Sequence, residues 1–153
     1  MSLDSYLSKC RKQAIEFLIN GFAANHMSLV VPSRRKDDLM FTDARRVYPP
    51  MRLKMYFGNG EHFSLRKRDL TENYVIAYVW NLDTEPEALF LTQQEAASIL
   101  GDAPLKTQSW VRDGYYRWSS ATGVPARRRE LLYSLYRERW AWLLNRLRHQ
   151  RSM

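Results

Sequence analysis

The chain has 153 residues, of which 45% are hydrophobic and 26% are charged, which is ordinary for a single globular domain and excludes wholesale disorder. No stretch approaches the roughly 20 apolar residues that a bilayer span requires, so no membrane partner is expected. The first residues contain no apolar run before a small-residue cleavage site, and Cys10 is the only cysteine. These features exclude a disulfide framework and a cysteine-based zinc site, and they favour a cytoplasmic location.

The charge balance is strongly basic. Lysine and arginine number 24 against 16 acidic residues, which gives a net charge of +8. Such an excess favours a polyanionic partner, and DNA is the partner we expect. The alternative for the arginines after Pro125 is a solvated helix face whose stems cover apolar surface. The residues predicted to bind nucleic acid are Arg34, Arg35, Lys36, Arg66, Lys67, Arg68, Arg127, Arg128 and Arg129.

Hydrophobic periodicity divides the first hundred residues into a helix and a set of strands. Apolar residues recur at helical spacing over residues 4–24, which predicts an amphipathic helix of about five turns. The following runs are short, rich in β-branched or aromatic residues, and bounded by Pro, Gly, Asn or Asp, as strands are. The predicted strands lie near residues 28–31, 38–42, 51–57, 74–81 and 88–92.

Two of these segments carry especially specific signals. Residues 74–80 are apolar at every position, which is typical of a central strand covered on both faces. Thr92 and Glu95 have the spacing of a capping box, in which each side chain accepts a hydrogen bond from the other residue's backbone N–H. They predict a helix that begins there and ends at Gly101.

The last third of the chain is predicted to contain a loop and a helix. Residues 102–124 are rich in aromatics but lack periodicity, which indicates a long loop. An apolar stripe behind Pro125 predicts a single basic helix over residues 125–149. Trp140 and Trp142 are two residues apart and cannot share a helix face, so at least one should pack on the core or a partner. The whole pattern predicts one α/β domain with a mixed central β-sheet flanked by helices.

Three polar residues stand out on this skeleton. Asp38 opens the second strand, while Arg52 and Lys54 share one face of the third, because residues two apart in a strand point the same way. A hairpin through residues 43–50 would place Asp38 beside both. An acid and a lysine on neighbouring strands are suited to hold a divalent cation and polarise a water for phosphodiester hydrolysis. The plain alternatives are a solvated turn for Asp38 and an edge-strand lysine that discourages aggregation for Lys54.

The arrangement resembles the PD-(D/E)xK nuclease superfamily, particularly its small bacterial and phage members and intron-encoded homing endonucleases. Pro32 followed by the strand at Asp38 matches the Asp-led strand, and the Arg-Leu-Lys triplet at 52–54 falls where Glu-x-Lys or Gln-x-Lys is expected. Glu16 fits the acid of the first helix. The resemblance covers about residues 10–100 and implies a restriction-endonuclease-like fold with Mg²⁺- or Mn²⁺-dependent cleavage of DNA.

The resemblance also implies a role for each residue of the catalytic set. Asp38 and Glu16 would ligate the metal, Arg52 would contact a phosphate, and Lys54, half-buried at most, would position and polarise the attacking water. Arg52 stands where the family usually places a carboxylate, and a guanidinium cannot ligate a metal. The missing carboxylate would come from Glu16 or from one of Glu61, Asp69 and Glu72.

The sequence is also consistent with two other functions. One is a catalytically inactive nucleic-acid-binding module in which Arg52 marks the loss of the metal site. The other is a protein-interaction module whose aromatic loop and C-terminal helix dock on a partner. Because nucleases that cut both strands are often dimers or tetramers, a homodimer or higher homo-oligomer is a further expectation.

Overall fold

The computed structural model describes residues 2–31, 38–59, 63–67, 74–100, 111–112, 114–118 and 126–149. The elements in these ranges are α1 (Leu3–Ala24), β1 (Met27–Val30), β2 (Asp38–Asp43), β3 (Met51–Phe57), β4 (Phe63–Arg66), β5 (Val75–Trp80), β6 (Glu87–Leu91), α2 (Gln93–Leu100), β7 (Tyr115–Trp118), α4 (Ala126–Tyr136) and α5 (Trp140–His149). The expected single α/β domain with a mixed sheet flanked by helices is confirmed.

The main sheet contains five of the described strands in the order β1-β2-β3-β5-β6. The first three form an antiparallel meander, β5 joins β3 in parallel, and β6 pairs antiparallel with β5. Every residue of β5 is buried, which confirms the prediction of a central strand covered on both faces.

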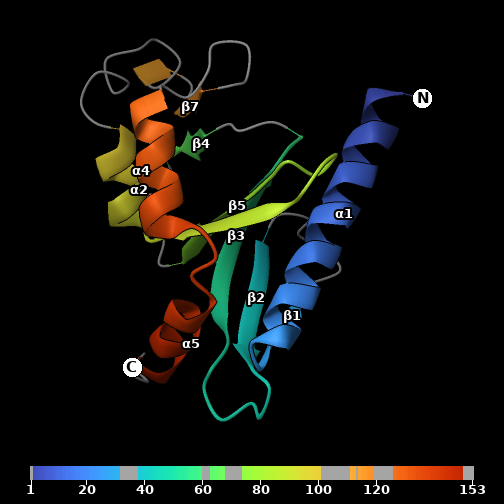
Figure 1. The fold of residues 1–153 in the computed structure, drawn as a ribbon, viewed down its shortest axis with the longest axis vertical. Coiled ribbons are helices and arrows are strands. Elements are labelled where there is room, and N and C mark those ends of the chain that lie inside the picture. Colours follow the sequence, from blue (N-terminus) through green and yellow to red (C-terminus); the bar gives the residue numbers. More distant parts are fainter. Residues whose placement is uncertain are drawn as a thin grey trace.

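The sheet buries a separate hydrophobic cluster on each face. Odd-numbered residues of β5 pack with α1 and α5, whereas its even-numbered residues pack with α2, α4 and β4. Figure 1 shows α1 on one side of the sheet and α2 and α4 together on the other. We call these the α1 face and the α4 face, because this division decides which polar side chains can meet.

Helix starts follow the local sequence signals. The Ser2 side chain caps α1 by accepting a hydrogen bond from the Ser5 backbone N–H at 3.2 Å. At α2 the Glu95 N–H donates to the Thr92 hydroxyl at 3.1 Å, and the Thr92 N–H donates to Glu95 Oε1 at 2.9 Å. The capping box is thus confirmed.

The predicted single C-terminal helix is wrong, because the chain breaks into α4 and α5. Leu132 of α4 packs on the α4 face, whereas Leu143 of α5 packs on the α1 face. Between them Glu138 adopts a φ of 56° and crosses the edge of β6, where its N–H donates to the Ala88 carbonyl at 2.8 Å. The Ala88 N–H donates in return to Glu138 Oε1 at 3.1 Å. A single straight helix cannot pack against both faces of the sheet. The chain therefore breaks at Glu138 and passes around the edge of β6.

The predicted loop over residues 102–124 also contains a strand. β7 pairs antiparallel with β4 in a small second sheet, with Phe63 opposite Trp118. Neither segment was predicted as a strand, because each is only four residues long and pairs with a segment far away in the sequence. Most of the remaining loop lies outside the described residues.

Candidate nucleic-acid interface

Asp38 and Lys54 lie directly opposite each other in the antiparallel pairing of β2 with β3. Residues opposed in this way have Cβ atoms about 4.5–5.5 Å apart. Arg52 lies two residues before Lys54 on the same strand, opposite Met40. The predicted hairpin that brings Asp38 beside Arg52 and Lys54 is therefore confirmed at the level of the backbone register.

Lys54 is far more buried than expected. Its neighbours Leu53 and Met55 belong to the cluster on the α1 face, so Lys54 points to the α4 face, as does Ile76 opposite it on β5. Only 7% of Lys54 is exposed, which corrects the expectation of a half-buried side chain. The edge-strand alternative is also wrong, because β3 lies between β2 and β5.

Lys54 is buried to a degree that is rare for a lysine. The ion pairs between described side chains are Arg137 with Glu87 and Arg139 with Glu95, whereas the side chain of Asp38, opposite Lys54, lies outside the described part of the structure. Removing an ammonium from water costs several kcal/mol unless a partner compensates it. An apolar residue would fill this position of a central strand at lower cost, so the lysine points to a role other than packing.

Aromatic rings lie on the same face of the sheet as Arg52 and Lys54. The Arg52 guanidinium lies 5.4 Å from the centre of the Tyr74 ring, within cation–π range. Further along the same face, Tyr78 stacks between Tyr56 and Phe63, with ring centres 5.3 and 4.8 Å apart. The face thus carries one ring beside Arg52 and a stack of three rings further along the sheet.

Glu16 does not lie near these residues. It is exposed on α1, whose buried side chains pack on the α1 face, while Lys54 lies on the α4 face. The sheet therefore separates Glu16 from Lys54, contrary to the geometry expected from the resemblance. No group of three His, Cys, Asp or Glu residues suited to a metal occurs in the described part of the chain. The side chain of Asp38 and the residues Glu61, Asp69 and Glu72 lie outside the described part of the structure, so the Mg²⁺ or Mn²⁺ site stays a prediction.

Several of the other predicted basic residues also belong to the α4 side. Arg66 and Lys67 are exposed at the end of β4, which packs on the α4 face through Phe63 and Leu65. Residues 127–129 occupy the first turns of α4, the helix that covers the same face. The predicted residues outside the described ranges are Arg34, Arg35, Lys36 and Arg68.

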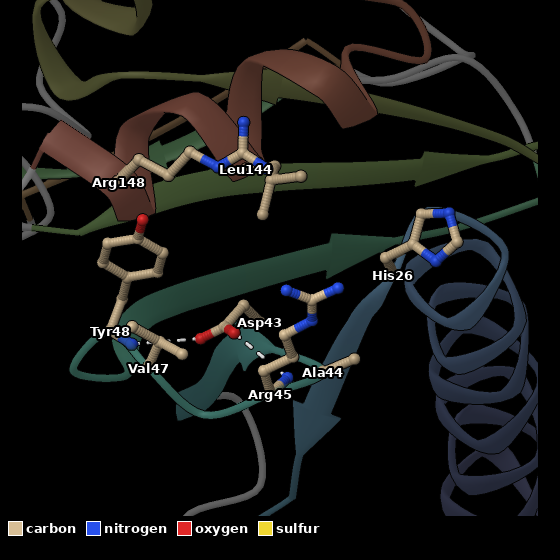
Figure 2. A pocket seen from close by; sticks show the side chains of 8 residues that line it. All are labelled: His26, Asp43, Ala44, Arg45, Val47, Tyr48, Leu144 and Arg148. Carbon is tan, nitrogen blue, oxygen red and sulfur yellow. Dashed lines mark hydrogen bonds between the residues drawn. The ribbon is translucent and has the colours of Figure 1, made fainter.

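The structure also contains a basic cluster that the sequence did not predict. It lines a pocket of about 470 Å³ between the β2–β3 turn and α5, shown in Figure 2. Arg45 comes from the turn, Arg148 from α5, and His26 from the turn between α1 and β1. The basic pair at positions 45 and 46 was the available signal, but nothing in the sequence brings it to Arg148.

The acid in this pocket, Asp43, organises the turn. Its Oδ2 accepts a hydrogen bond from the Arg45 N–H at 3.0 Å, and its Oδ1 accepts one from the Tyr48 N–H at 3.1 Å. Burial acts to raise the pKa of Asp43, but the backbone N–H groups of Tyr48, Val47 and Arg45 outweigh it and hold the pKa below the ordinary 3.8. Asp43 therefore stays ionised at neutral pH, and both of its oxygens bond to the backbone of its own turn.

Comparisons with known proteins give no assignment. No protein-family model, no curated protein and no solved structure matches this chain. Within the described ranges, no helix has the length and apolar character needed to cross a membrane.

Proposed function

We propose that the protein binds DNA, with the phosphate backbone engaged by the basic residues of the α4 face. The observation that carries the proposal is the placement of Arg52 and Lys54 on one side of a central strand, with Lys54 only 7% exposed. Arg66 and Lys67 extend the basic character to the exposed end of β4 on the same side. The net charge of +8 supports a polyanionic ligand.

Within this proposal the cations have different tasks. Exposed Arg66 and Lys67 contact phosphates along the duplex, while the half-buried Arg52, oriented by Tyr74, contacts one phosphate drawn toward the sheet. Lys54 lies deeper and raises the positive potential there, because a charge with little water around it is weakly screened.

Fluorescence anisotropy with a labelled duplex tests the binding. Plotted against log salt, log K should fall with a slope of about −0.9 for each phosphate neutralised. Replacing Arg66 and Lys67 together with Gln should make the slope shallower by about 2. The control replaces Lys9 and Lys12, which are exposed on α1 at the opposite face, and should leave the slope nearly unchanged. Equal effects of both pairs would contradict a DNA-binding α4 face.

DNA cleavage is a second candidate, supported by one observation. Asp38 and Lys54 are directly opposed on neighbouring strands, as the resemblance to PD-(D/E)xK nucleases requires. The test is incubation of plasmid DNA with Mg²⁺ or Mn²⁺. Cleavage that is lost in Asp38→Asn, and in Lys54→Met at protein concentrations where each variant is fully bound to DNA, supports an endonuclease. Absence of cleavage by the wild-type protein leaves DNA binding alone as the proposed function.

A further inference from the structure

We propose that the pocket between the β2–β3 turn and α5 binds a phosphorylated ligand of nucleotide size through Arg45 and Arg148. Its volume of about 470 Å³ lies within the range of about 300–1,000 Å³ that is usual for small-molecule sites. Figure 2 shows the Arg45 side chain rising from the turn toward α5, and the Tyr48 ring standing between the turn and Arg148.

The pocket keeps a net positive charge, because Arg45 and Arg148 outnumber the lining acid Asp43. Both oxygens of Asp43 accept hydrogen bonds from backbone N–H groups of the turn, which orient this carboxylate toward the turn. The ion pairs between described residues involve neither Arg45 nor Arg148. Two guanidinium groups at one cavity favour phosphate, because their planar N–H groups match its oxygens in pairs.

The other residues that line the pocket favour a ligand larger than phosphate alone. Leu144 and Val47 give the pocket an apolar wall, and Tyr48 adds an aromatic ring with a hydroxyl. A phosphate group between the arginines would leave this wall for an apolar or ring-shaped body. A nucleoside monophosphate has both parts, either as a free molecule or as the phosphorylated end of a DNA strand.

This inference is independent of the proposed DNA-binding face. Tyr48 and Leu144 pack against the cluster on the α1 face, whereas Lys54 lies on the α4 face. The two sets of residues can therefore be changed separately, and one proposal can fail while the other holds.

Isothermal titration calorimetry with dAMP tests the pocket, with deoxyadenosine as the ligand that lacks phosphate. The wild-type protein should bind dAMP and not deoxyadenosine. Arg45→Gln and Arg148→Gln should each weaken dAMP binding by about tenfold or more, because each removes a charged hydrogen-bonding partner. Arg46→Gln is the matched control, since Arg46 is an exposed neighbour that does not line the pocket.

A comparison of DNA strands with a 5′-phosphate and a 5′-hydroxyl end identifies the source of the ligand. Preference for the 5′-phosphate, lost in Arg45→Gln, assigns the pocket to strand ends. Binding of dAMP without that preference assigns it to free nucleotides, and both results support the proposal. Failure of the wild-type protein to bind either ligand, or an equal loss in Arg46→Gln, would overturn it.

Discussion

Trp140 of α5 packs directly against Gly21 of α1. A Cβ atom added at Gly21 would lie 2.3 Å from the indole Cη2 and 2.4 Å from Cζ2, well inside van der Waals contact. The indole cannot easily move away, because its ring also contacts Phe22 and Phe90, with centres 5.2 and 4.8 Å apart. Its N–H donates to Glu138 at 2.6 Å. The missing side chain at Gly21 thus allows α5 to dock beside α1.

Gly21→Ala should therefore destabilise the protein, although alanine is the better helix former by about 1 kcal/mol. Overpacking of this kind costs about 1–3 kcal/mol, which exceeds the gain in helix propensity. Urea unfolding measures the change. The control is the same substitution in a Trp140→Leu background, where the smaller side chain should abolish most of the added penalty. A stabilised Gly21→Ala protein would contradict the contact.

Lys54→Met should leave the free energy of unfolding unchanged or raise it. Methionine has a similar length, and it removes the cost of burying an ammonium in a central strand. DNA affinity should fall in the same variant if Lys54 supplies positive potential to the interface. Urea unfolding and anisotropy together separate the two effects. Marked destabilisation by Lys54→Met would instead assign Lys54 a structural role.

The sequence predicted those parts of the structure that depend on local signals. The β5 strand was predictable because residues 75–80 are all apolar, and the start of α2 because Thr92 and Glu95 cap each other. The neighbourhood of Asp38 and Lys54 was predictable because a hairpin joins adjacent strands through one short connection. Each inference needed only residues close together in the chain.

Features that depend on distant contacts were not predictable. The leucine pattern runs through the break at Glu138, and what ends α4 is pairing with Ala88, fifty residues earlier in the chain. Glu16 lies on an amphipathic helix, but the sequence does not say which face of the sheet that helix covers. The pocket arises only when Arg148 of α5 reaches the turn at Arg45.

Arg139→Lys should destabilise the protein by about 1–2 kcal/mol. The Arg139 guanidinium donates to both oxygens of Glu95 at 3.1 Å and lies 3.7 Å from the Trp142 ring centre. Lysine keeps the charge but loses both the paired hydrogen bonds and the flat stacking surface. Arg148→Lys, an exposed change on α5, is the control and should cost less than about 0.5 kcal/mol. Equal stabilities of the two variants would contradict this account.

Asp43 should govern part of the acid sensitivity of folding. Its pKa is held below the ordinary 3.8 in the folded state, so the unfolded chain binds the proton more readily. The stabilisation is therefore complete above the ordinary pKa and is lost as the pH falls through the lower folded value. Asp43→Asn removes the titrating group while keeping one acceptor oxygen for the turn.

The measurement is urea unfolding of both proteins at a series of pH values from 7 down to about 2. Wild type should be the more stable protein at neutral pH, and its advantage over Asp43→Asn should shrink once the pH drops below about 4. Asp83→Asn, at an exposed turn position, serves as the control for the loss of a carboxylate as such. If the Asp43→Asn curve instead stayed parallel to wild type down to pH 2, the backbone N–H groups of the turn would not be what keeps this carboxylate ionised.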